Sequence, residues 1–232
     1  NKSLKLDLTL IDDSIPWGKR DNDSHLFLWG TKTADLFKNR RNVNIVSNPV
    51  ADNYYNGYFE KRKNFHLLDS LSLGNEKTIL ISAQCLEDVS DKDKVLLWYK
   101  KIIESFPKLN FIIKIHPRDK LNNFKSFKKS NNVKILHRDY SFRSLLKVSD
   151  INLSHYSATS MDAILYGIPV ILLPTDILNT LNLNYWYSSE IFFKPETISS
   201  CIDHIEKSLN FSFNENYMLK RKNFIKNMYS KH

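Results

Sequence analysis

The residues with the clearest chemical potential follow an apolar run, FIIKI, at positions 111–115. β-Branched and aromatic residues are typical of a buried strand, and Pro117 stops such a strand because it has no N–H to donate. The predicted strand therefore ends at His116, and Arg118 follows two positions later. Parallel α/β sheets bind ligands at the carboxyl ends of their strands. An imidazole can donate a hydrogen bond to a phosphate oxygen, and a guanidinium can neutralise the phosphate with a bidentate fork. His116, Pro117 and Arg118 are therefore a candidate anion site.

A second group of polar residues lies in the segment SHYSATSMDAILYGIPVILLP, residues 154–174. The pattern predicts a strand followed by a helix whose start holds Ser157, Thr159 and Ser160. The N–H groups at a helix N-terminus lack internal partners and carry a positive partial charge, so a phosphate fits there. Ordinary N-capping by serine and threonine explains the same residues. Both interpretations stay open on this segment alone.

Asp162 follows these hydroxyl residues on the same predicted helix. A carboxylate at this place can accept hydrogen bonds from ribose hydroxyls, as an acidic residue does in dinucleotide-binding folds. A carboxylate that interacts with the helix dipole is the equal alternative. Taken together, the two segments place anion-binding groups at one edge of one predicted sheet, which favours a nucleotide site.

The elements that must position these residues alternate between strands and helices from Lys77 onward. Five apolar runs are separated by segments of helical periodicity: KTILISA, FIIKI, VKILH, DINLSHYS and IPVILLP. Continuously apolar strands separated by helices are typical of a parallel sheet that is covered on both faces and connected by right-handed crossovers. The predicted fold class is therefore α/β, with a Rossmann-like parallel sheet.

The first 70 residues follow a weaker pattern. HLFLWG and VNIVSNP are short predicted strands, and LKLDLTLI is an alternating strand that ends in Asp12 and Asp13. We interpret residues 1–70 as the end of a first α/β domain plus a linker, and residues 71–232 as a second domain with two closing helices. Thr197 is the expected N-cap of the first closing helix.

Composition limits the classes of protein that remain. The 232 residues, 42% of them hydrophobic, are sufficient for a packed core, and the net charge of +9 favours anionic partners. Cys85 and Cys201 match no metal-binding or redox spacing, so we expect neither a metal nor a disulfide framework. No apolar run reaches the roughly 18 to 20 residues that a membrane span needs. The sequence begins without Met, so we expect that residues before Asn1 have been lost or removed.

The order of these motifs resembles the nucleotide-binding half of GT-B glycosyltransferases. The order resembles that of bacterial sialyltransferases, which use CMP-sialic acid, and of relatives that use CMP-Kdo or CDP-glycerol. The features that carry this resemblance are His-Pro after one strand, SATS after a later strand, an acidic helix and YGIPVI. The resemblance is best over residues 77–174. It implies a GT-B-type C-terminal domain with a remnant of an N-terminal α/β domain. It also implies inverting transfer, without cofactor or metal, of a sialic acid-like sugar from a cytidine-nucleotide donor to a surface-glycan acceptor.

The same resemblance implies roles for individual residues. Those enzymes carry an acidic pair in the N-terminal domain, and Asp12 and Asp13 occupy the corresponding place, with Ser14 where glycine is usual. Asp13, with Asp12, is then the base that removes the acceptor proton, while His116 and the hydroxyl residues stabilise the departing phosphate. A structural turn with two solvated carboxylates is the alternative for the acidic pair.

The resemblance also suggests where such a protein works. Polysaccharide assembly occurs at the cytoplasmic face of the inner membrane, which implies a cytoplasmic protein with peripheral contact to anionic lipid. We expect the helix around Lys220, Arg221 and Lys222 to lie against the sheet domain or against such a membrane surface. The alternatives are a CDP-glycerol- or CMP-Kdo-type transferase, a nucleotide-binding module without catalysis, and a sugar epimerase of the same fold. Nucleic acid is not an expected partner, because the aromatic cluster at residues 54–59 is not interleaved with basic residues.

Overall fold

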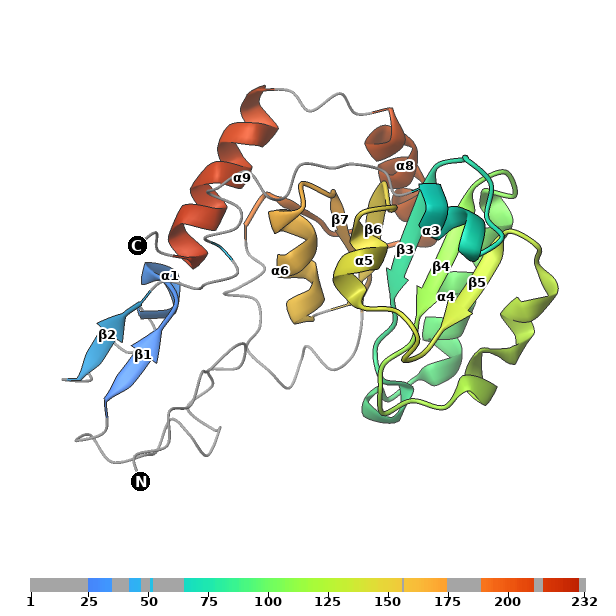
Figure 1. The fold of residues 1–232 in the computed structure, drawn as a ribbon, viewed down its shortest axis with the longest axis horizontal. Helices are drawn as coiled ribbons and strands as arrows, with labels where there is room; N and C mark the ends of the chain where they lie inside the picture. The colour runs from blue at the N-terminus through green and yellow to red at the C-terminus, as the bar shows by residue number, and fades with distance from the viewer. Residues whose placement is uncertain are drawn as a thin grey trace.

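The fold is taken from a computed structural model of the chain (Figure 1). The structure describes residues 25–34, 42–46, 51, 65–155, 157–174, 189–210 and 215–229. Asp12 and Asp13 lie outside the described residues.

A six-stranded parallel sheet forms the centre of the larger domain, in the order β5-β4-β3-β6-β7-β8. Its strands are β3 (Thr78–Ser82), β4 (Asn110–Lys114), β5 (Val133–Leu136), β6 (Ile151–Ser154), β7 (Val170–Leu172) and β8 (Phe192–Phe193). This sheet confirms the predicted α/β, Rossmann-like fold class. The sequence pattern does not predict β8, because two residues are too few to form a recognisable apolar run.

Helices cover both faces of the sheet, which explains why its strands are apolar on both sides. The helical segments are α1 (Thr31–Ala34), α3 (Phe65–Ser70), η2 (Leu86–Asp88), α4 (Lys92–Ser105), η3 (Leu121–Lys129), α5 (Phe142–Leu146), α6 (Ala158–Leu165), α8 (Ile198–Leu209) and α9 (Glu215–Met228), where η marks a 3₁₀ helix. Successive residues of a strand point to opposite faces. Leu80 and Ile112 therefore join a core with α5, α6 and α9, while Ile81 and Ile113 join a core with α4 and α8.

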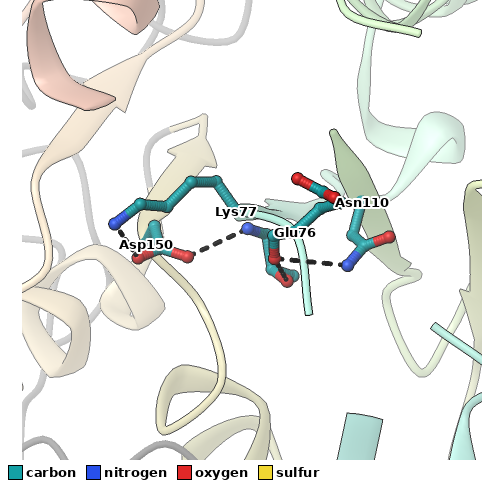
Figure 2. A network of polar contacts seen from close by, with 5 residues as sticks. Glu76, Lys77, Asn110 and Asp150 are labelled. Carbon is teal, nitrogen blue, oxygen red and sulfur yellow. Dashed lines mark hydrogen bonds and ion pairs between the residues drawn. The ribbon is translucent and has the colours of Figure 1, made fainter. Parts of the chain in front are cut away.

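A polar network fixes the amino end of the central strand β3 (Figure 2). The carboxylate of Asp150, just before β6, accepts hydrogen bonds from the main-chain N–H of Thr78 at 2.9 Å and from Nζ of Lys77 at 3.2 Å. Asn110 at the start of β4 donates to the carbonyl oxygen of Glu76 at 3.3 Å. These bonds tie together the beginnings of three neighbouring strands, at the edge opposite to the predicted site.

The N-terminal part of the described chain forms a separate two-stranded parallel sheet, β1 (Leu26–Leu28) and β2 (Val43–Ile45). α9 lies against this part as well as against the larger domain (Figure 1). Oγ1 of Thr31 donates to the carbonyl oxygen of Asn227 at 3.3 Å. Gly30 approaches α9 so closely that a Cβ atom at this position would clash with the carbonyl oxygen of Met228.

Arg221 joins α9 to the end of α6. Its guanidinium is buried, and Nε donates to the carbonyl oxygen of Ile164 at 2.7 Å. An Nη donates to the carbonyl oxygen of Leu165. These carbonyl groups lie at the C-terminal end of α6, where that of Ile164 also accepts from the N–H of Gly167 at 3.0 Å. The helix ends there because Gly167 adopts a positive φ of 73°, the conformation that favours glycine.

The first closing helix begins as the sequence predicts. Oγ1 of Thr197 accepts a hydrogen bond from the N–H of Ser200 at 3.1 Å, and Oγ of Ser200 accepts from the N–H of Thr197 at 3.2 Å. This reciprocal pair is a capping box and confirms Thr197 as the N-cap of α8. Among all helices in the described part of the chain, none combines the length and the apolarity needed to cross a membrane.

Candidate functional site

The three central strands of the sheet end at the same level. Ser82 of β3 is paired in register with Lys114 of β4 on one side and with Ser154 of β6 on the other. The chain leaves β3 through β4 and β5 and then returns to β6 on the opposite side of β3, so the strand order reverses between β3 and β6. Open α/β sheets bind ligands beyond the strand ends at such a point. His116 and Ser157 follow this row closely, and we call the segments that follow Ser82, Lys114 and Ser154 the carboxyl edge.

His116 lies in a β-turn that its neighbours dictate. Proline suits the second position of such a turn, and the N–H of Asp119 donates to the carbonyl oxygen of His116 at 2.9 Å. The N–H of Arg118 donates to Nδ1 of His116 at 3.2 Å. Because Nδ1 accepts this bond, a neutral ring carries its proton on Nε2.

The charge state of His116 favours the same arrangement. Burial lowers the pKa of His116, and the nearby Arg118 lowers it further, while Asp88 and Asp119 act in the opposite direction. The net lowering keeps the ring neutral near pH 7. His116 therefore offers one hydrogen-bond donor, Nε2–H, at the carboxyl edge.

Arg118 is bound to a carboxylate in this structure. Its exposed guanidinium forms two hydrogen bonds with Asp88, of which the Nη1–Oδ1 bond is 3.2 Å long. Hydrogen bonding to Asp88 raises the pKa of Arg118 above its usual value. The fork that the sequence assigns to a phosphate is thus occupied by Asp88, and its role toward a ligand stays a prediction.

The N-terminus of α6 lies where the hydroxyl residues predict it. Ser157 is the N-cap, and its Oγ accepts hydrogen bonds from the N–H of Thr159 at 3.3 Å and from Oγ1 of Thr159 at 3.0 Å. Ala158 is exposed, so this first turn is open to solvent. Ser160, by contrast, is fully buried, and its hydroxyl donates to the carbonyl oxygen of His155 at 3.4 Å. The hydroxyl of Ser160 therefore faces the protein interior, away from the surface that a phosphate could reach.

Asp162 lies on α6 opposite the start of α5. Its Oδ2 is 3.8 Å from Nε of Arg143, and its side chain is 29% exposed. Burial raises the pKa of Asp162, and Arg143 opposes this shift. α5 begins just beyond the end of β5, so the ion pair lies near the carboxyl edge. Sequence reasoning did not find Arg143, because a single arginine in a helical segment carries no distinguishing signal.

The loop after β5 is tied to the His116 turn. Nζ of Lys114 donates to the carbonyl oxygens of His137 and of Tyr140, the latter at 2.7 Å. Nε2 of His137 donates to the carbonyl oxygen of Pro117 at 3.2 Å. Burial lowers the pKa of Lys114. A lysine at the end of an otherwise apolar strand is the sequence signal that could have marked this contact.

His155, next to the serine-rich turn, is enclosed by the larger domain. Its Nε2 and the hydroxyl of Tyr99 form a hydrogen bond of 2.8 Å, and both side chains are fully buried. Burial lowers the pKa of His155 to about 4. The residue is therefore a neutral part of the core near pH 7.

The remaining candidates for metal binding are histidines, cysteines and carboxylates. The residues that the structure describes contain no group of three or more His, Cys, Asp or Glu side chains arranged to hold a metal ion. Cys85 and Cys201 are both buried free thiols.

The sequence matches the model of one protein family over most of its length. A family model described as "Protein of unknown function (DUF354)" matches residues 2–224. The chain belongs to the DUF354 family. A comparison with curated proteins gives no match to this DUF354 chain.

Several solved structures share the fold of the DUF354 chain. UDP-GlcNAc 2-epimerase from Methanocaldococcus jannaschii, in complex with UDP-GlcNAc and UDP, matches with a TM-score of 0.60 and 20% identity over 82% of this chain and 56% of the epimerase chain. A variant of the wall teichoic acid polymerase TagF matches with a TM-score of 0.63 and 13% identity over 91% of this chain and 55% of the polymerase chain. The spinosyn rhamnosyltransferase SpnG, complexed with thymidine diphosphate, matches with a TM-score of 0.50 and 14% identity over 67% of this chain and 43% of that chain.

These similarities establish the architecture of the DUF354 chain. The matched regions are Rossmann-like domains of GT-B proteins, which confirms the predicted GT-B-type fold. The DUF354 chain spans about half the length of these proteins, between 43% and 56%. At identities of 12–22% the likeness concerns the fold, so substrate and reaction must be argued from the residues of the carboxyl edge.

Proposed function

We propose that the chain contains the nucleotide-binding domain of a glycosyltransferase that moves a sialic acid-like sugar from a cytidine-nucleotide donor to a glycan acceptor. The observation that carries the proposal is the position of two half-sites on either side of β3. His116 with its Nε2–H donor follows β4, and the open N-terminus of α6 follows β6. Both lie beyond the strand ends where the strand order reverses, which is where this type of sheet binds nucleotides.

The chemistry of this edge suits a departing phosphate. When the bond between sugar and phosphate breaks, negative charge grows on the phosphate oxygens. A helix N-terminus and a neutral imidazole donor stabilise that charge, because both are fixed before the reaction begins. Ala158 is exposed at this N-terminus, and Ser157 and Thr159 are partly exposed beside it, with the hydroxyl of Thr159 donating to Oγ of Ser157.

Asp162 is proposed to bind the ribose of the donor. Its half-buried carboxylate is held in place by Arg143. A carboxylate can accept hydrogen bonds from both ribose hydroxyls. The preference for cytidine, and for a sialic acid-like sugar, rests on the resemblance of the His-Pro and SATS motifs to enzymes that use CMP-sugars.

The acceptor side of the reaction is proposed from the sequence. Asp13, supported by Asp12, removes the proton of the acceptor hydroxyl as it attacks, which inverts the configuration at the sugar carbon. In this proposal residues 1–70 belong to an acceptor-side domain and residues 71–232 form the nucleotide domain. The transfer needs no metal ion, because the α6 N-terminus and His116 supply the groups that face the phosphate.

Peripheral contact with an anionic membrane at the cytoplasmic face is part of the same proposal. Of the basic residues first considered on α9, Arg221 is buried and Lys220 forms an ion pair with Glu190. Lys222 and Lys226 are exposed on the same helix and are the remaining candidates for lipid contact. Flotation with vesicles of neutral or anionic lipid tests this contact, and equal binding to both kinds of vesicle would contradict it.

A panel of nucleotides tests the proposed donor. CMP and CDP should raise the melting temperature more than UDP or GDP, because the motifs resemble those of enzymes that use cytidine nucleotides. A ligand at about 100 times its dissociation constant adds roughly 2.7 kcal/mol to the stability of the folded state. Consumption of CMP-sialic acid, CMP-Kdo and CDP-glycerol, measured with and without EDTA, then distinguishes the transferase alternatives. Nucleotide binding without donor consumption would leave a non-catalytic module, and a response to UDP alone with isomerisation of UDP-sugars would indicate an epimerase.

A further inference from the structure

We propose that Asp119 is a positioning residue that holds the His116 turn and the loop after β3 together as one ligand-binding edge. This role rests on the proposed function, because it assigns a purpose to the same site. Asp119 does not contact the proposed ligand. It acts through His116 and through the backbone that follows β3.

The carboxylate of Asp119 is buried and satisfied by groups from both loops. Its side chain belongs to a residue that is only 4% exposed. Oδ1 accepts hydrogen bonds from the N–H of Lys120 and from Nδ2 of Asn123, both at 2.7 Å. Oδ2 accepts from the N–H of Leu86 at 2.9 Å, which lies 33 positions earlier in the chain. A buried carboxylate is costly unless it is bonded in this way, so the three bonds stabilise Asp119 in this position.

The bond to Leu86 connects the ends of two neighbouring strands. Leu86 is the first residue of η2, and only Ala83, Gln84 and Cys85 separate it from the end of β3. β3 is the central strand at the reversal of strand order. The loop after β3 therefore lies between the two proposed half-sites, and Asp119 fixes it to the His116 turn.

The main chain of Asp119 belongs to the turn that orients the imidazole. The N–H of Asp119 closes the turn by donating to the carbonyl oxygen of His116, and the N–H of Arg118 inside that turn donates to Nδ1. Anchoring the carboxylate thus keeps the Arg118 N–H directed at Nδ1, which keeps the ring proton on Nε2. When the anchor is lost, both ring nitrogens can carry the proton, and the Nε2 donor is present for only part of the time.

A matched carboxylate at the opposite edge of the sheet separates positioning from plain stability. Asp150 is also largely buried and accepts a main-chain N–H bond, from Thr78 at 2.9 Å (Figure 2). It ties strand beginnings together as Asp119 ties strand ends. Asp119→Asn and Asp150→Asn therefore remove the same charge from comparable environments, and only the first is beside His116.

The test combines nitrogen-15 NMR of the histidine rings with calorimetric titration of CMP. The His116 signals are identified by their loss in His116→Ala. In the unmodified chain, Nε2 should have the shift of a protonated ring nitrogen and Nδ1 that of an unprotonated one. Asp119→Asn should average the two shifts and weaken CMP binding about twofold, because the tautomer with the proton on Nε2 is then present about half of the time. Asp150→Asn should lower the melting temperature as much as Asp119→Asn does, but it should leave the ring shifts and the CMP affinity unchanged.

Asn123→Ala keeps the result decisive even when Asp119→Asn fails to fold. It removes one of the three donors to the carboxylate, and it should shift the ring signals and the CMP affinity in the same direction by a smaller amount. Unchanged ring signals in Asp119→Asn and Asn123→Ala, or equal changes in Asp150→Asn, would overturn the positioning role. Failure of the unmodified chain to bind CMP would instead reject the proposed function, while the ring signals would still decide the role of Asp119.

Discussion

The main-chain N–H of Arg118 donates to Nδ1 of His116 at 3.2 Å, two residues back in the same turn. The bond fixes the tautomer of a neutral histidine, so that its remaining proton is on Nε2. β4 ends at Lys114, two residues earlier than the predicted end at His116, and Pro117 bends the chain into this turn. The sequence His-Pro-Arg thus produces a hydrogen-bond donor of defined orientation at the end of a parallel strand.

Asp88→Asn should strengthen CMP binding at low ionic strength. Asp88 occupies the guanidinium of Arg118, and its removal frees that group for a phosphate. Since exposed ion pairs contribute little, the gain should be modest, roughly two- to fivefold in affinity. Calorimetric titration at two salt concentrations measures it, and salt should reduce the gain.

Asp203→Asn is the control for this change of charge. Asp203 is exposed on α8, away from the carboxyl edge, and its replacement by Asn changes the net charge by the same amount. It should leave CMP affinity unchanged. An equal gain in both variants would show that net charge is responsible, and a loss of affinity in Asp88→Asn would contradict a role for free Arg118.

His155 should make the protein sensitive to acid. Its pKa is about 4 in the folded state and near 6.5 in an unfolded chain. Between these pH values the unfolded state binds more protons than the folded state. The contribution of neutral His155 to the unfolding free energy is therefore fully present above pH 6.5 and decreases as the pH falls toward 4. The loss is on the order of 3 kcal/mol. His155→Gln should flatten the dependence of the unfolding free energy on pH in this window, measured by urea unfolding.

His66→Gln is the matched variant for that experiment. His66 is exposed on α3, and its replacement should leave the pH profile unchanged. A profile that is as steep in His155→Gln as in the unmodified chain would show that other groups govern the acid sensitivity.

Gly30→Ala should separate the N-terminal part from α9. The new Cβ would clash with the carbonyl oxygen of Met228, which is a backbone atom and cannot rotate away. Overpacking of this kind typically costs about 1 to 3 kcal/mol. Gly74→Ala meets no atom within 4 Å and serves as the control. Thermal unfolding of the two variants measures the difference, and equal melting temperatures would contradict the close packing of Gly30 on α9.

The sequence was most informative where local patterns determine local structure. The apolar runs predict β3 to β7, and the small hydroxyl residues predict the start of α6, because burial and capping act over a few neighbouring residues. The same holds for Thr197 at the start of α8. For the same reason Ser160 could not be distinguished from Ser157 by its sequence, since only the packing of α6 on β6 directs its hydroxyl inward.

Contacts between distant segments could not be derived from the sequence. Asp119 accepts a hydrogen bond from Leu86, and Arg118 donates to Asp88, each from one loop to another. Neither contact produces a periodic pattern in the sequence. Arg221 is a further case. It occurs in a run of basic residues, and the sequence does not indicate which of them is buried; the structure buries Arg221, which donates to the carbonyl oxygens of Ile164 and Leu165.

Calorimetric titration of CMP into the unmodified chain and into His116→Ala, with melting curves of both, tests the central claim most directly. His116 is only partly buried, so its removal should move the melting temperature by no more than about 2 °C. It should weaken CMP binding about tenfold to a hundredfold, the value of one hydrogen bond to a charged group. His66→Ala, an exposed substitution on α3, should bind like the unmodified chain. Equal CMP affinity in His116→Ala, with a clearly lower melting temperature, would show that His116 is a structural residue and would contradict the claim that it holds the phosphate of a nucleotide donor.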